Sequence, residues 1–175
     1  MKKVSNKALI RFLVSALIIY FGWYLTYTLW LHPWKKLDLA IINNLIFLSS
    51  HILTFLNYKL IDYPYSESVR TIGIDGSHGL WIGDPCNGIT LFALFTGFII
   101  AYPGKIKWKL IFIPSGLIAI HLLNVFRIVG LALITFYFPK YLDFNHTYTF
   151  TIIIYSFIFL LWYYFAANPA FRKSF

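Results

Sequence analysis

The sequence has few charged residues and a single cysteine. Only 12% of its 175 residues are charged, whereas a soluble globular domain carries roughly a quarter. Because Cys86 stands alone, an internal disulfide and any metal or redox site built on a CxxC pair are excluded. The sequence also lacks an HExxH pair, internal repeats and low-complexity linkers. This composition argues against a soluble globular domain.

Acidic residues are the scarcest charged group. Six Asp and Glu stand against fifteen Lys and Arg, which gives a formal net charge of +9. A basic balance can indicate nucleic-acid binding, but here the cations form short clusters between apolar runs, as residues that flank membrane spans do. We therefore expect no nucleic-acid partner. The clusters are Lys2, Lys3 and Lys7; Lys35 and Lys36; Lys105, Lys107 and Lys109; Arg172 and Lys173.

Apolar and aromatic residues are abundant instead. They make up 59% and 21% of the chain, and the mean hydropathy is +0.70. About 20 apolar residues suffice to cross the hydrocarbon core of a bilayer as a helix. The sequence therefore predicts an all-α polytopic membrane protein, with residues 1–175 as a single integral membrane domain. The five expected spans are residues 9–31, 39–56, 88–102, 110–138 and 146–165.

The longest stretch between these spans is residues 57–87. Its segment 69–76 has β-branched residues that lead into Asp75-Gly76, a pattern typical of a strand followed by a turn. A second extended piece at 79–82 would complete a small hairpin over the spans. Because this loop leads directly into Cys86, we expect it to recognise the sequence motif of the substrate.

Five spans would place the two chain ends on opposite sides of the membrane. Two spans separate Cys86 from His146, so both residues are expected on one face. If that face is outside, seven Lys and Arg lie on each side, and the positive-inside rule favours neither orientation. The basic N-terminus would then lie outside, a conflict that a re-entrant first segment would remove.

Cys86 lies where the polar loop meets the third apolar run. Pro85 precedes it and Asn87-Gly88 follows, which predicts a position at or just before a helix N-terminus. The positive end of a helix dipole and a nearby cation both favour a thiolate. A lone cysteine is, however, more often a small buried apolar residue than a nucleophile.

Arg127 lies inside the fourth apolar run. A charge at the bilayer centre costs about 2.5–3.5 kcal/mol on insertion scales, so such residues usually face a partner or a polar cavity. His121, Asn124 and Arg127 are spaced three apart, which places them on one face of a helix. The alternative is an arginine that extends its head group to the membrane surface.

His146 opens the last apolar run, and on its own it could be an ordinary interfacial residue. Near a cysteine it can take and return a proton. Together the residues predict a cysteine peptidase or transpeptidase, with Cys86 as nucleophile, His146 as general acid and base, and Arg127 as stabiliser of the oxyanion. Asn87 and Asn124 are the expected substrate-binding residues. No metal or other cofactor is needed.

Three motifs resemble the exosortase/archaeosortase family: Pro85-Cys86-Asn87-Gly88-Ile89, Leu123-Asn124-Val125-Phe126-Arg127-Ile128, and His146 at the head of the last span. The resemblance covers residues 79–165, about half of the chain. It implies a multi-pass protein of the cell inner or plasma membrane with an extracytoplasmic active site, and the same roles for Cys86, Arg127 and His146.

The resemblance also implies the partners. These are exported proteins whose C-terminal sorting signal has a short motif, a transmembrane helix and a basic tail, and a membrane lipid or surface glycan that receives the cleaved protein. The chain is shorter than the larger bacterial members, which leaves room for an accessory subunit.

Two other functions remain open at this point. A metal-dependent protease could use His78, His121 and His146 with Asp75 or Asp84, although no histidine pair has the spacing of a zinc-binding helix. A small transporter or assembly factor could use Asn43, His121, Asn124 and Arg127 as a polar lining. The second function predicts that Cys86 is dispensable.

Overall fold

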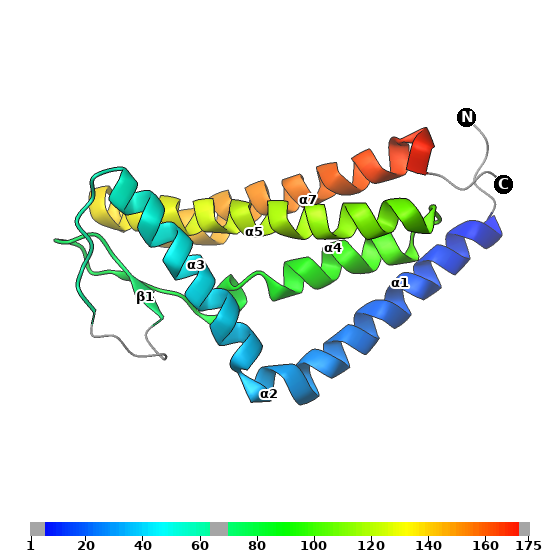
Figure 1. The fold of residues 1–175 in the computed structure, drawn as a ribbon, viewed down its shortest axis with the longest axis horizontal. Coiled ribbons are helices and arrows are strands. Elements are labelled where there is room, and N and C mark those ends of the chain that lie inside the picture. Colours follow the sequence, from blue (N-terminus) through cyan, green and yellow to red (C-terminus); the bar gives the residue numbers. More distant parts are fainter. Residues whose placement is uncertain (1–5, 64–69, 172–175) are drawn as a thin grey trace.

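The computed structural model describes residues 6–63 and 70–171. Helices dominate these residues, and those of the second half of the chain lie beside one another along the long axis of the molecule (Figure 1). This architecture confirms the predicted all-α polytopic membrane protein. The five long helices are α1 (Asn6–Thr26), α3 (Lys36–Phe55), α4 (Ile89–Ala101), α5 (Ile106–Tyr137) and α7 (Phe150–Ala167).

Within residues 6–63 and 70–171, four helical stretches are long and apolar enough to cross a membrane. They are Leu9–Trp34, Lys36–Phe55, Ile106–Tyr137 and Pro139–Ala167. The first includes the π-helical turn Tyr27–Leu31 and the short helix α2 (His32–Trp34). The third predicted span forms only the 13-residue helix α4, which at 1.5 Å per residue measures about 20 Å, less than the ~30 Å hydrocarbon core.

The second half of the chain forms longer helices than predicted. α5 has 32 residues and contains Pro114 without a break in its helical assignment. α7 continues a helical stretch that begins with the 3₁₀ turn Pro139–Tyr141, α6 (Leu142–Phe144) and the π-helical turn Asn145–Thr149. His146 therefore lies on the π-helical turn, one residue after it begins.

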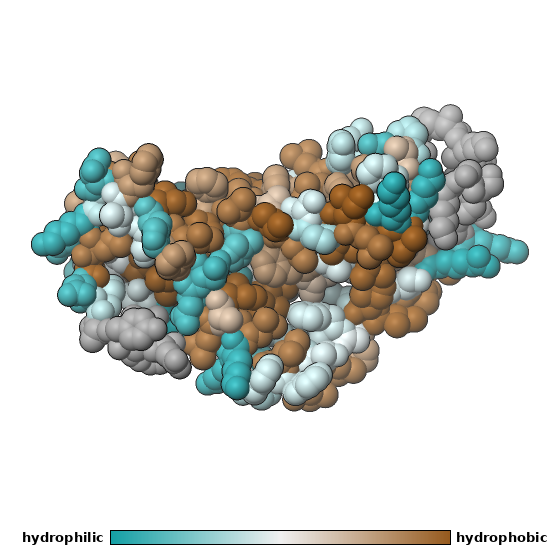
Figure 2. Space-filling view, in the orientation of Figure 1, coloured by the Kyte–Doolittle hydropathy of each residue, from teal (hydrophilic) through white to brown (hydrophobic). Residues whose placement is uncertain are grey.

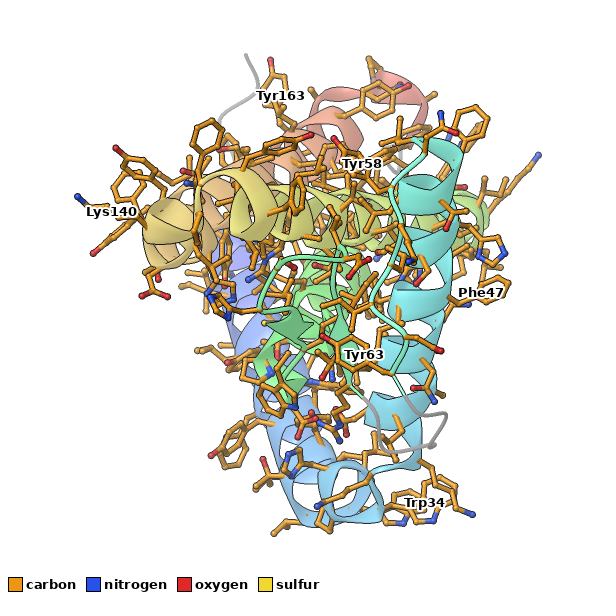
Figure 3. The ribbon with its side chains drawn as sticks, turned by 90° about the vertical axis from the view of Figure 1, so that its left-hand side faces the viewer. Trp34, Phe47, Tyr58, Tyr63, Lys140 and Tyr163 are labelled. Atoms are coloured by element: carbon orange, nitrogen blue, oxygen red, sulfur yellow. The ribbon has the colours of Figure 1, made fainter. Side chains whose placement is uncertain are left out.

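The predicted hairpin is present. β1 (Thr71–Ile72) pairs antiparallel with β2 (Leu80–Trp81), with Thr71 opposite Trp81 and Ile72 opposite Leu80. Figure 3 looks at the molecule from the hairpin end, with Tyr63 beside the strands. An added Cβ at Gly79 would lie 2.1 Å from the Tyr63 hydroxyl oxygen, so this close packing needs a glycine.

Two apolar clusters join these elements. In the first cluster the hairpin packs against α3 and α5. Its buried members are Ile42, Leu53, Ile72, Ile74, Ile82, Ile128, Val129 and Ala132. The other joins α4, α5 and α7 around Phe95 and Phe165, which are 0% and 1% exposed. Apolar residues also cover much of the outer surface in the middle of the molecule, whereas hydrophilic residues gather at both ends and around α2 (Figure 2).

α1 and α3 form a V, and the turn between them faces the start of α4 (Figure 1). The start of α1 lies at one end of the molecule, where the Phe12 ring is 5.4 Å from that of Phe98. The end of α3 leads to the other end, where the hydroxyls of Tyr58 and Tyr137 are 2.9 Å apart. Together, α1 and α3 therefore make a single passage from one end of the molecule to the other.

Both ends of the described chain therefore lie on the same side of the molecule. The Phe171 carbonyl accepts a hydrogen bond from the Lys105 N–H at 2.9 Å, which places the end of the described chain beside the α4–α5 turn and near α1. The expectation that the chain ends lie on opposite sides does not hold for these residues. Polar contacts are the physical reason. Side chains at the α1–α3 turn bind residues next to Cys86, and these contacts keep the turn at the level of the Cys86 loop.

Candidate active site

Cys86 ends a short 3₁₀ helix, Asp84–Cys86, just before α4. Gly88 has φ of +86°, a left-handed conformation that glycine adopts without strain. This residue turns the chain into α4, whose first residue is Ile89. The expectation of a cysteine just before a helix N-terminus therefore matches the local structure.

The structure brings Cys86, His146 and Arg127 together from three separate elements. Cys86 Sγ lies 3.3 Å from His146 Nε2, and Arg127 Nη2 donates to Sγ across 4.0 Å. The thiol and the imidazole are both partly exposed, whereas Arg127 is only 9% exposed. A thiol with a base on one side and a fixed cation on the other has the arrangement of an activated nucleophile.

Asn124 lies one turn before Arg127 on α5 and is completely buried. Its Nδ2 donates to the Cys86 carbonyl oxygen at 2.9 Å, so it holds the backbone of the cysteine. Within the described part of the chain, Asn124 Oδ1 and Arg127 Nε have no hydrogen-bond partner. Such buried unpaired groups are uncommon in folded proteins.

His121 does not join this group, although it shares a face of α5 with Asn124 and Arg127. Its Nε2 lies 2.8 Å from Asn44 Oδ1 on α3. His78, the third histidine considered as a metal ligand, is exposed on the loop. Among the residues that the structure describes, no cluster of three or more His, Cys, Asp or Glu side chains has the arrangement of a metal site.

The family assignment agrees with this geometry. A family model for transmembrane exosortases matches residues 2–164. The chain belongs to the transmembrane exosortase family. The match extends the resemblance from the second half of the sequence to α1 and α3, and it supports a multi-pass exosortase-type membrane protein. No curated protein and no solved structure matches the chain.

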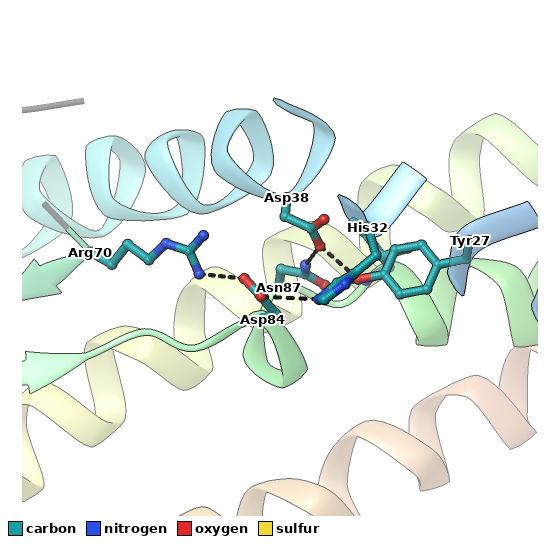
Figure 4. A network of polar contacts seen from close by, with 7 residues as sticks. Tyr27, His32, Asp38, Arg70, Asp84 and Asn87 are labelled. Carbon is teal, nitrogen blue, oxygen red and sulfur yellow. Dashed lines mark hydrogen bonds and ion pairs between the residues drawn. The ribbon is translucent and has the colours of Figure 1, made fainter. Parts of the chain in front are cut away.

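Two carboxylates in this exosortase flank the cysteine, and the sequence did not indicate either role. Asp84, two residues before Cys86, forms an ion pair with Arg70 and lies 3.3 Å from His32 Nε2 through its other oxygen (Figure 4). It therefore links the loop both to the segment before β1 and to the α1–α3 turn.

Asp38 is the second carboxylate, at the start of α3. Its Oδ1 accepts hydrogen bonds from the Tyr27 hydroxyl at 2.7 Å and from Asn87 Nδ2 at 2.5 Å (Figure 4). Asn87 is 2% exposed, and its Oδ1 accepts from the Ile89 N–H at 2.8 Å. Asn87 thus uses both of its polar atoms within the protein, in contrast to Asn124.

Proposed function

We propose that this exosortase is a membrane cysteine peptidase or transpeptidase that cleaves the C-terminal sorting signals of exported proteins. The observation that carries the proposal is the 3.3 Å approach of Cys86 Sγ to His146 Nε2, with the Arg127 guanidinium on the same sulfur. Nucleophile, base and cation come from separate elements, and such convergence is the geometry that covalent catalysis requires.

The first half of the reaction forms a thioester. Cys86 gives its proton to His146, and the thiolate attacks the scissile carbonyl carbon, so that a C–S bond forms and the carbonyl π electrons move onto oxygen. The Arg127 guanidinium, 4.0 Å from Sγ, is close enough to stabilise an oxyanion on the carbon bonded to that sulfur. His146 then protonates the leaving amine as the C–N bond breaks.

The second half releases the product. His146 takes a proton from water or from the nucleophilic group of an acceptor, which attacks the thioester carbon while Arg127 again stabilises the oxyanion. The C–S bond breaks and the Cys86 thiolate is restored. Attack by water gives hydrolysis, whereas attack by an acceptor transfers the protein to a lipid or glycan carrier.

The two asparagines have different relations to a substrate. Among the described residues, no group pairs with Asn124 Oδ1 beside Cys86, which supports a contact with a substrate N–H. Asn87 is engaged on both polar atoms inside the protein, which favours holding the loop over touching the substrate.

The distribution of charge supports an extracytoplasmic position for the Cys86 loop. The end of the molecule formed by the start of α1 and the α4–α5 turn carries Lys7, Arg11, Lys105, Lys107 and Lys109. None of the six acidic residues lies in residues 1–11, 102–110 or 168–175. By the positive-inside rule this end is cytoplasmic, and the hairpin end faces out.

The proposed substrates are exported proteins with a motif, a transmembrane helix and a basic tail at the C-terminus. The transmembrane helix would place the motif near the outer surface, at the level of a cysteine that lies just before a membrane-embedded helix. A membrane lipid or surface glycan is the proposed acceptor, and an accessory subunit is the proposed aid to substrate selection.

Hydroxylamine tests the proposed thioester directly. Membranes from cells that carry the wild-type chain are incubated with hydroxylamine, and the C-termini of surface proteins are read by mass spectrometry. A thioester predicts new C-terminal hydroxamates, which are absent with Cys86→Ala and present with the control Ser156→Ala, a change on the exposed side of α7. Cleaved proteins that carry only free carboxylates, at every hydroxylamine concentration and in both variants, would contradict the proposal.

A further inference from the structure

Asp38 is a buried carboxylate that the proposed reaction does not use. It is only 1% exposed, and both of its hydrogen bonds go to a single oxygen, Oδ1. Within the described residues, Oδ2 is buried without a partner. A buried carboxylate with an unsatisfied oxygen is unfavourable for folding, so its presence at this place points to a role other than stability.

The structural connection from Asp38 to the nucleophile is short. Asp38 receives the Asn87 amide, and Asn87 follows Cys86 directly in the chain. The peptide group between Cys86 and Asn87 is held on its carbonyl by Asn124. The Cys86 carbonyl is therefore held from α5, and the side chain of the next residue, Asn87, is held from α3.

The chemistry of the pair fixes the direction of the Asn87 amide. An ionised carboxylate can only accept hydrogen bonds, whereas an amide has one donating and one accepting end. Asn87 must therefore turn Nδ2 toward Asp38, which leaves Oδ1 for the Ile89 N–H at the start of α4. The reversed amide would set oxygen against oxygen at Asp38 and N–H against N–H at Ile89.

We propose that Asp38 is a positioning residue, which orients the Asn87 amide and so holds Cys86 Sγ at bonding distance from His146. This inference rests on the proposed function, because it assigns a place to the proposed nucleophile. It also gives a role to the V formed by α1 and α3, since the turn between them delivers both Asp38 and Tyr27 to the loop (Figure 4).

An exchange of the two side chains tests this role. Asn87→Asp sets two carboxylates against each other, and Asp38→Ala removes the acceptor. A misplacement of about 1 Å can lower a rate about 100-fold, so we expect each single variant to process surface proteins at least about 10-fold more slowly per folded molecule. The double variant Asp38→Asn/Asn87→Asp restores one donor and one acceptor, and should recover to within about threefold of wild type.

The readout is the fraction of surface proteins that have lost their C-terminal helix, measured by mass spectrometry and divided by the amount of folded chain. The melting temperature is measured in parallel, because a residue that only stabilises the fold would lower it without changing processing per folded molecule. Ser156→Ala is the control: it changes an exposed side chain on α7, outside the loop and the α1–α3 turn, and should process normally.

Three outcomes separate the possibilities. Recovery in the exchange variant, after loss in Asn87→Asp, supports the positioning role. Normal processing per folded molecule in Asp38→Ala overturns this role. A double variant that folds but stays inactive overturns it too. If Asp38→Ala does not fold, the double variant alone decides. Cys86→Ala separates the two proposals. If Cys86→Ala processes normally, the proposed function fails. If Cys86→Ala is inactive and Asp38→Ala is active, only the positioning role fails.

Discussion

At the scale of single residues, His146 offers a variant that separates chemistry from folding. Its imidazole is only partly buried and lies on a π-helical turn, so its replacement leaves no large cavity. General acid and base catalysis contributes about 100- to 10,000-fold to a rate. We expect His146→Gln to lower processing of surface-protein C-termini within this range, with little change in melting temperature. Normal processing in a folded variant would remove His146 from the mechanism.

Two substitutions of Arg127 separate the effect of its positive charge from the effect of its planar shape. Arg127→Lys keeps the cation but loses the planar fork of donors, whereas Arg127→Gln loses the cation. Loss of one oxyanion donor typically lowers kcat by about 100- to 1,000-fold. We expect the Gln variant to lose activity to this extent and the Lys variant to lose less, measured per folded molecule. Equal activities in wild type and Arg127→Gln would show that the charge is not needed.

The sequence was sufficient to single out Cys86, Arg127 and His146, which the structure brings together, because a reactive or charged group is conspicuous in apolar surroundings. It was not sufficient for Asp38 and Asp84. Their partners Asn87 and His32 lie 49 and 52 residues away, and no local pattern marks such contacts. Asn87 was predicted to bind substrate, and only the folded chain shows that its polar atoms are engaged internally.

At the scale of elements, the break before α4 determines where Cys86 lies. Gly88 has a positive φ, and an added Cβ would lie 3.2 Å from Asn124 Nδ2, the group that holds the Cys86 carbonyl. A left-handed conformation costs an alanine about 1–2 kcal/mol. We expect Gly88→Ala to lower both the melting temperature and processing per folded molecule.

Gly22→Ala is the matched control for this glycine. It lies inside α1, and an added Cβ there would meet no atom of the described residues within 4 Å. Alanine in a helix is more favourable than glycine by about 0.5–1 kcal/mol, so this variant should be unchanged or slightly more stable. A Gly88→Ala protein that melts and processes like Gly22→Ala would show that the left-handed turn is not required.

Hydropathy was a good predictor of which residues are helical, but not of where each helix begins. α4 is short because Asn87 and Gly88 turn the chain just before it. The π-helical turns at Tyr27–Leu31 and Asn145–Thr149 have unrelated sequences, YTLWL and NHTYT, so hydropathy does not mark them. The hairpin was predictable because Asp75-Gly76 is a strong local turn signal.

At the scale of the whole molecule, the V of α1 and α3 changes the predicted topology. Lys107 lies at the basic end, and Asp75 lies in the hairpin turn at the opposite end. In a Cys86→Ala background, an impermeant maleimide added to sealed right-side-out membranes should label Asp75→Cys and not Lys107→Cys. Labelling of Lys107→Cys alone would reverse the proposed orientation.

The proposed function depends above all on Cys86 as the group that performs the cleavage, and one comparison tests this role. The C-termini of all surface proteins are read by mass spectrometry in cells that carry either the wild-type chain or Cys86→Ala at equal levels of folded protein. We expect a set of proteins that keep their C-terminal membrane helix only with Cys86→Ala. Identical C-termini in the two strains, with the wild-type chain present and folded, would contradict the cleavage role and favour a transporter or assembly factor.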